Sequence, residues 1–133
     1  YGSIHRNSYL DSPRVLLPTL QTRRCPDLLI AGQLTGVEGY VESIGAGLVA
    51  GVNAARLTRG EAALAWPTGT MLGGLLAYIT DTLDSDRFQP MNANFGLLPP
   101  VLDRLRGRHR RQAMSESALR TARDFVQTSA LWP

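Results

Sequence analysis

The chain has 133 residues, a formal net charge of +3 and 44% apolar residues, and all of its basic side chains are arginines. This length is typical of one domain with its own core, and the apolar content excludes an intrinsically disordered chain. A single cysteine, Cys25, excludes an internal disulfide and a cysteine-rich zinc site. The uncharged run at the apolar centre, residues 43–55, is shorter than the roughly 18 residues of a membrane-spanning helix. The amino end lacks the apolar segment of a signal peptide.

Charge is divided unevenly along the chain. Residues 1–100 carry seven arginines and eight acidic residues, a net of −1, whereas residues 101–133 carry seven arginines and three acidic residues, a net of +4. A dense basic run can neutralise phosphates, although it is also typical of a solvated helix face. No aromatic residue interrupts this run, so stacking on single-stranded bases is not expected. The candidate nucleic-acid-binding residues are Arg104, Arg106, Arg108, Arg110 and Arg111.

Residues 1–36 are expected to form extended segments, including a few short strands, that lead into a tight turn. Three prolines in this region favour extended backbone at the residues before them. The short apolar run Asp27–Ala31 predicts a buried strand of a parallel sheet. The glycine-rich stretch Gly32–Tyr40 follows this run as a turn.

A helix is predicted over residues 37–60. Thr35 and Glu38 have the spacing of a capping box, in which each side chain accepts a hydrogen bond from the backbone amide of the other residue. Gly60 is placed to end the helix in the left-handed conformation. Apolar residues recur at helical spacing on one face, namely Val41, Ile44, Leu48, Val52 and Ala55.

The same helix has three glycines in its interior, Gly45, Gly47 and Gly51. Each glycine destabilises a helix by about 1 kcal/mol relative to alanine. The expected reason is the close approach of another backbone or of a flat cofactor, with tight helix packing as the alternative.

The remaining elements are two helices and the loop that joins them. Leucines at helical spacing predict a helix over residues 70–83, closed by Asp84–Asp86. Residues 84–100 are too apolar for a linker and too rich in helix breakers for a helix, so we expect an ordered, packed loop. A basic helix is predicted over residues 101–128, with a bend or interruption at Gly107. The chain is therefore expected to be mainly α.

The residues supply little catalytic chemistry. His5, His109 and Cys25 have no metal-ligand spacing, and no catalytic or metal-binding residue is predicted. The turn at Gly32–Tyr40 precedes a helix start, whose free amides and dipole form a site for an anion or a polar ligand. The Gly-x-Gly-x-x-Gly fingerprint of dinucleotide-binding folds is absent from the chain.

Three stretches of the chain resemble the TrmFO family of folate- and FAD-dependent tRNA (uracil-5-)-methyltransferases. They are Tyr1–Leu10 with Pro13 and Leu20-Gln21, then Ala31–Ser43 with Gly47–Ala55, and the loop Phe88–Pro99. The related GidA-type flavoproteins share the Gly-Gln turn but lack the Met-Asn-Ala-Asn-Phe sequence of that loop.

The resemblance implies that the chain is similar to the carboxyl-terminal third of a bacterial, cytoplasmic flavoprotein with an α/β fold built on a doubly wound sheet. Such an enzyme methylates a tRNA uracil with the carbon of methylenetetrahydrofolate, which is reduced by NAD(P)H through FAD. The part that binds the FAD phosphates and the family's catalytic cysteines has no match here, so the chain alone is expected to bind FAD weakly or not at all and to be inactive. The cofactor-binding residues implied by the match are Gly32, Gln33, Thr35, Gly36 and Tyr40.

The alternative function is a free-standing binding module without catalytic activity. Its ligand would be RNA at the arginine cluster, another anion, or a polysaccharide stacked on Trp66, Trp132 or tyrosines. Small-residue and apolar surfaces that pack on a larger fold would be exposed in this module, so a homo-oligomer is expected.

Overall fold

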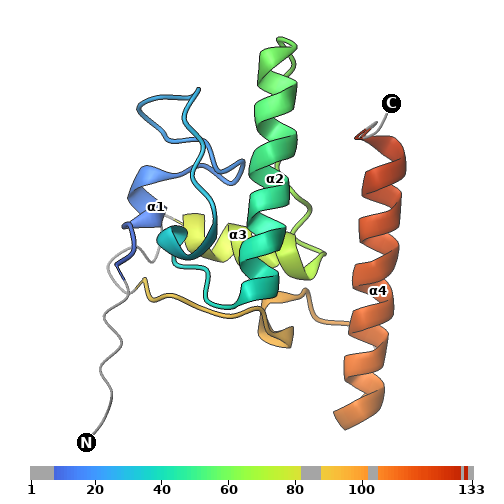
Figure 1. Ribbon diagram of the computed structural model, residues 1–133. Helices are drawn as coiled ribbons and strands as arrows, with labels where there is room; N and C mark the ends of the chain where they lie inside the picture. Colours follow the sequence, from blue (N-terminus) through green and yellow to red (C-terminus); the bar gives the residue numbers. More distant parts are fainter. Residues whose placement is uncertain (1–7, 82–87, 102–104, 130, 132–133) are drawn as a thin grey trace, which may run out of the picture.

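The computed structural model describes residues 8–81, 88–101, 105–129 and 131 (Figure 1). Four α-helices are present in this part of the chain, and the mainly α fold predicted from the sequence is confirmed. They are α1 (Ser12–Val15), α2 (Tyr40–Thr58), α3 (Met71–Thr80) and α4 (Gly107–Thr128), accompanied by the 3-10 turns η1 (Gly32–Thr35) and η3 (Phe95–Leu97).

The hydrophobic core lies where α3 packs against α1, α2 and the amino-terminal segment. In Figure 1, α3 crosses behind the long upright helix α2. Helix α3 begins one residue after Thr70. The Thr70 side chain accepts a hydrogen bond from the Gly73 amide at 3.0 Å and so caps the first turn of α3. The helix ends at Thr80, and the predicted terminator Asp84–Asp86 lies outside the described residues. The fully buried core side chains include Leu16, Leu20, Val37, Val49, Leu75, Leu76 and Ile79.

The prediction of extended backbone throughout residues 1–36 is wrong at Ser12–Val15, which form α1 with a proline in its first turn. The remaining extended segments pair only as isolated bridges within the described part of the chain. The predicted parallel strand at Asp27–Ala31 is wrong, because Leu29 pairs in antiparallel fashion with Gln21 and Leu28 is 51% exposed. Leu20 has a positive φ of 66°, and the backbone turns back on itself near this residue. Leu16 therefore pairs with Thr22, and Gln21 pairs with Leu29. A parallel bridge does form elsewhere, between Val37 and Met91.

The predicted capping box at the start of α2 is also wrong. Thr35 belongs to η1, where its hydroxyl donates to the Gly32 carbonyl at 2.7 Å, and the N-cap of α2 is Gly39 with φ 105°. The Glu38 amide donates to the Met91 carbonyl at 3.1 Å. Local hydrogen bonding by threonine therefore prevails over the cap, a known competition for this side chain. At the other end, Gly60 has the predicted left-handed φ, 71°.

The last helix, α4, is held against the rest of the chain by an aromatic contact and a buried methionine. The Trp66 and Phe125 rings meet edge to face with centroids 4.9 Å apart, and Met114 of α4 is buried. The helix begins at Gly107, φ 55°, so this glycine starts the helix instead of interrupting it. Residues 102–104 lie outside the described part of the chain.

The segment Phe88–Pro100, which the sequence predicts to be a packed loop, is packed in part, since Phe88 lies against the core and Phe95 is 39% exposed. Phe88 contacts the rings of Tyr9 and Tyr78, with centroids 6.0 Å and 6.2 Å apart. Leu98 is buried, and Leu97 packs against the core. Among the described helices, none has the length and hydropathy required to cross a membrane.

Candidate functional site

The turn Gly32–Tyr40 and the loop Phe88–Pro100 meet at the start of α2, although about 50 residues separate them in the chain. The Met91 amide donates to the Gly36 carbonyl at 3.0 Å. The Ala93 amide donates to the Glu42 carboxylate at 3.2 Å, so the loop is also tied to the first turn of α2. We call this junction the α2 corner; it unites two of the three stretches that resemble the TrmFO family.

Gly36 is required at the α2 corner for two reasons. Its φ is +83°, a region that favours glycine, and a Cβ atom built on it would lie 2.5 Å from the ring of Phe88. The Phe88 ring therefore covers this residue. Gly60 offers a comparison, because its φ is +71° and no atom lies within 4 Å of an added Cβ.

A shallow cavity of about 350 Å³ opens at the α2 corner. Gln33 and Tyr40 line it, and Tyr40 is 92% exposed. The described residues supply no side-chain cap for α2, so the amides of its first turn lie beside the cavity without a side-chain acceptor. A neutral polar group can accept hydrogen bonds there, whereas the carboxylates of Glu38 at the cavity and Glu42 in the first turn disfavour an anion.

The five predicted cofactor residues are brought together but are not equally accessible. Gln33 and Tyr40 are exposed, and Gly32 is half-buried with φ +77°. Thr35 and Gly36 are buried, and the Thr35 hydroxyl already donates to the Gly32 carbonyl. In this structure, Thr35 and Gly36 therefore shape the turn, while Gln33 and Tyr40 present side chains to the cavity.

Besides Gln33 and Tyr40, the cavity is lined by four residues that the sequence does not predict as cofactor-binding, namely Glu38, Gly39, Ser43 and Asn92. The sequence places Glu38 in a capping box, and a capping role does not predict an exposed side chain at a cavity. Asn92 lies in the loop that carries the resemblance, so the signal for it was present in the Met-Asn-Ala-Asn-Phe sequence.

The outward face of α2 is apolar and uncovered by the described residues. Val41 is 78% exposed, Ile44 is 72% exposed and Leu48 is 47% exposed. Nothing lies within 4 Å of a Cβ built on Gly47 or Gly51. The close backbone approach expected at these glycines is therefore not made within the described chain. Gly45 differs, since an added Cβ would lie 3.0 Å from Leu72.

The basic cluster lies at the start of α4. Arg106, Arg108, Arg110 and Arg111 are all exposed, and Arg104 lies outside the described residues. The cluster is therefore a surface feature, separate in the chain from the α2 corner.

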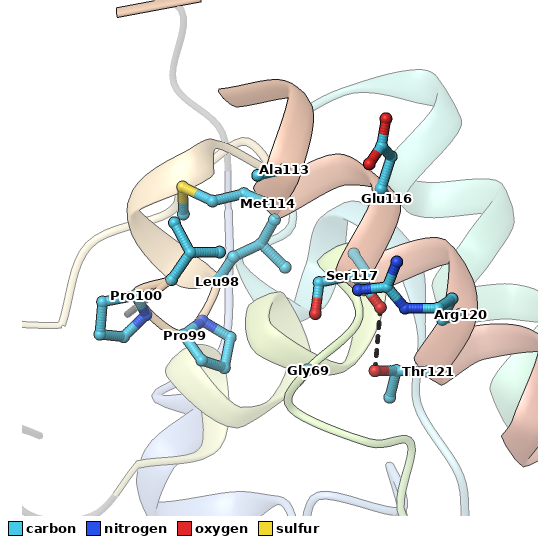
Figure 2. A pocket seen from close by; sticks show the side chains of 12 residues that line it. Gly69, Leu98, Pro99, Pro100, Ala113, Met114, Glu116, Ser117, Arg120 and Thr121 are labelled. Atoms are coloured by element: carbon cyan, nitrogen blue, oxygen red, sulfur yellow. Dashed lines mark hydrogen bonds between the residues drawn. The ribbon is translucent and has the colours of Figure 1, made fainter. Parts of the chain in front are cut away.

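A second cavity, of about 500 Å³, lies between α4 and the segment Leu98–Val101 (Figure 2). Pro99 and Pro100 form one side, and Ser117 and Arg120 come from α4. The Thr121 hydroxyl donates to the Ser117 carbonyl at 3.1 Å. This cavity contains none of the predicted cofactor residues.

The described residues contain no group of His, Cys, Asp or Glu arranged to hold a metal ion. Cys25 is an exposed free thiol. Beyond the carboxyl end of α2, a hydrogen bond from the Arg59 guanidinium lowers the pKa of Glu61 and raises the pKa of Arg59. His5 and Trp132 lie outside the described residues, and Trp66 is half-buried against Phe125.

Comparisons with known proteins found one matching family model and several similar proteins. A family model described as glucose inhibited division protein A matches residues 1–62. The chain is 51% identical over 127 residues to a protein of Heliobacterium modesticaldum named methylenetetrahydrofolate--tRNA-(uracil-5-)-methyltransferase TrmFO, covering 95% of this chain and 29% of that protein. A protein of the same name from Lactiplantibacillus plantarum is 54% identical over 120 residues, covering 90% of this chain and 27% of that protein.

One solved structure, titled as Aquifex aeolicus GidA in the form II crystal, resembles the fold with a TM-score of 0.55. The match covers 84% of this chain and 17% of that chain at 23% identity, so it speaks for the fold alone. The chain spans less than a third of the length of the curated relatives that it matches.

Proposed function

We infer the function of this chain from its homology, over nearly all of its own length, to a segment of the TrmFO family of tRNA methyltransferases. The chain is, on this proposal, the part of a methylenetetrahydrofolate- and FAD-dependent tRNA (uracil-5-)-methyltransferase that forms one wall of the flavin and folate site. The observation that carries it is identity of 51% to such an enzyme across 95% of the chain. We also predict a cytoplasmic location, because the resemblance to the TrmFO family implies it.

The α2 corner is the wall that we assign to the cofactor. Uncapped amides, a cavity of about 350 Å³ and an exposed aromatic side chain at Tyr40 fit a flat, polar-edged group such as the flavin of FAD. When bound, FAD would supply the electrons that reduce the carbon taken from methylenetetrahydrofolate, with NAD(P)H as their source. Gln33 and the first amides of α2 would donate hydrogen bonds, and Tyr40 would pack on an apolar surface of the ligand.

Gly32, Thr35 and Gly36 have a positioning role in this proposal. The hydrogen bond between Thr35 and Gly32 holds η1 together, and Gly36 allows the Phe88 ring to close over the turn. Their contribution to cofactor binding is to place Gln33 and Tyr40 beside the cavity.

A chimera tests the proposal. The homologous segment of the Heliobacterium modesticaldum enzyme is replaced by this chain, and FAD content and methyl transfer to tRNA uracil are measured. We expect the chimera to retain FAD and activity. A chimera that folds, as judged by its circular dichroism, but holds no FAD and transfers no methyl group would overturn the proposal.

Two variants of the chimera test the α2 corner itself. Tyr40→Ala and Gln33→Ala remove exposed side chains, so each should lower FAD content without changing the thermal unfolding temperature. Leu28→Ala is the matched control, because Leu28 is also exposed, at 51%, and does not line the cavity. Unchanged FAD content in both test variants would show that the wall lies elsewhere.

The chain by itself is expected to show little or no flavin absorbance, since the phosphate-binding fingerprint is absent. Self-association also stays a prediction, and the exposed Val41, Ile44 and Leu48 support it. Light scattering checks it: replacing Ile44 with lysine should shift an oligomer toward monomer. The alternative of a free-standing polysaccharide-binding module has no support from the comparisons.

A further inference from the structure

The arginines at the start of α4 are arranged against the electrostatic preferences of a helix. The amino end of a helix carries a positive partial charge, which favours acidic residues there and disfavours cations. The first turn of α4 contains no acidic residue, and four arginines lie within Arg106–Arg111. Like charges three or four residues apart, such as Arg108 and Arg111, also repel each other. This arrangement weakens the helix start.

The described residues do not offset this repulsion. All four arginines are exposed, and none forms a salt bridge with a described acidic residue. Elsewhere in the chain, Arg56 and Arg59 do pair with Glu61, at 3.0 Å and 2.7 Å. The first acidic residue of α4 is Glu116, beyond the cluster.

The chemistry of the cluster fits one kind of partner. Guanidinium groups bind phosphate through paired hydrogen bonds and remain charged at any physiological pH. The run Arg106–Gln112 has no large apolar side chain, and the imidazole of His109 is its one aromatic ring, so it offers no apolar patch and no extended stacking surface. A phosphate backbone matches these properties, because it requires positive charge and hydrogen-bond donors but no apolar contact.

We propose that Arg106–Arg111 at the start of α4 is an RNA-binding surface that holds backbone phosphates of a tRNA. The identity of the RNA rests on the proposed function, since the named relatives act on tRNA. The surface binds independently of sequence, so it contributes affinity and orientation, and the choice of uracil is made elsewhere. The local repulsion within the cluster is relieved when phosphates neutralise the arginines.

Anisotropy of a fluorescently labelled tRNA, titrated with the full chain between 50 and 200 mM salt, tests the proposal. The variant Arg108→Ala with Arg111→Ala removes two charges from the cluster. The matched control, Arg24→Ala with Arg123→Ala, removes two exposed charges outside it and leaves the same net charge. We expect the cluster variant to bind roughly tenfold more weakly and to lower the slope of log K against log salt by about 1.5. The control should change affinity less than about twofold.

Two results would overturn the RNA-binding surface. One is equal weakening by both double variants, which would mean that only net charge matters. The other is the absence of tRNA binding by the unchanged chain at 50 mM salt. Circular dichroism of each variant confirms that α4 is intact, and alanine favours the helix.

This test separates the RNA-binding surface from the proposed function. FAD content of the chimera depends on the α2 corner, which shares no residue with the cluster. A chimera that holds FAD, together with double variants that bind tRNA equally, contradicts the surface alone. A chimera that holds no FAD, together with a selective loss in the cluster variant, contradicts the proposed function alone.

Discussion

Helices α2 and α3 both contain glycines in their interiors, but only those of α3 face a backbone within the described chain. A Cβ on Gly74 would lie 2.7 Å from the Leu97 carbonyl oxygen, and one on Gly73 would collide with the Pro67 carbonyl. The outward glycines of α2, Gly47 and Gly51, face open space. The same sequence feature therefore reports close packing in one helix and an uncovered surface in the other.

This difference shows what a glycine in a helix can establish. Each glycine lowers helix stability by about 1 kcal/mol relative to alanine, and a packing contact offsets that cost in α3. In α2 the described chain provides no such contact at Gly47 or Gly51, and the neighbouring Val41 and Ile44 are more than two-thirds exposed. The outward face of α2 thus has the composition of a packed surface without a packing partner among the described residues.

The largest effect is expected for Gly73→Ala. The new methyl group would meet the Pro67 carbonyl, which belongs to backbone and cannot rotate away. We expect the free energy of unfolding to fall by about 3 kcal/mol, as measured by urea denaturation followed by circular dichroism. A loss below about 1 kcal/mol would mean that α3 shifts easily and that its glycines do not mark close packing.

The inward face of α2 gives the next largest effect, through Asn53. Its side-chain amide donates to the carbonyls of Thr19 and Leu64, both at 3.0 Å, and its oxygen accepts from the Leu64 amide at 2.8 Å. Asn53→Ala leaves these buried groups without partners, so we expect a loss of about 2 kcal/mol in the free energy of unfolding. Calorimetry checks this value.

Asn53→Asp is the control for that prediction. It keeps the acceptor for the Leu64 amide but removes the donor and adds a negative charge. Both variants should be destabilised, with the alanine variant unable to form any of the three bonds. Equal stability of Asn53→Ala and the unchanged chain would contradict the view that α2 is fixed from its inward face.

The third prediction concerns the outward glycines of α2, where substitution by alanine should stabilise the chain, whereas Gly73→Ala in α3 should destabilise it. Gly47→Ala combined with Gly51→Ala places two methyl groups in open space and removes the conformational freedom of two glycines. We expect the free energy of unfolding of the chain to rise by about 1.5 kcal/mol. If chemical denaturation instead gives a lower free energy of unfolding for the double variant, these glycines are already in contact, for example with a second copy of the chain.

The smallest effect is expected at the carboxyl end of α2, for Glu61→Gln. A hydrogen bond from Arg59 lowers the pKa of Glu61, so the stabilisation is present above its unfolded pKa and is lost as pH falls through the folded value. Because the pair is exposed, the melting temperature at neutral pH should be unchanged within error. On acidification, the unchanged chain should lose slightly more stability than the variant. A large drop at neutral pH would contradict this.

Much of the fold follows from local pattern. Leucine spacing predicts α3 to within three residues at each end, and the stop of α2 near Gly60 is correct. The start of α2 is not, since Thr35 bonds within its own turn. Helical spacing also identified Val41 and Ile44 as one apolar stripe, but it does not say whether that stripe is covered, and the structure leaves it exposed.

The candidate site also contains residues that the sequence predicts and residues that only the structure identifies. The resemblance to the TrmFO family implies Gly32, Gln33, Thr35, Gly36 and Tyr40 as one group, and these residues lie close enough in the chain to share one corner of the structure. Glu38 and Asn92 line the same cavity but were not predicted to do so. Asn92 reaches it only because the Met91 backbone pairs with Val37, a contact between distant segments that has no local signal.

The sequence by itself determined the uneven charge of this protein, the positions of most of its helices, and its likeness to the TrmFO enzymes. These depend on residue type and on spacing within a few turns, which the chain carries locally. Only the tertiary structure decided that the loop Phe88–Pro100 closes on Gly36, that Thr35 is buried, and that the glycines of α3, unlike Gly47 and Gly51, touch backbone. Burial and contact depend on which distant segments pack together, and no local pattern specifies that.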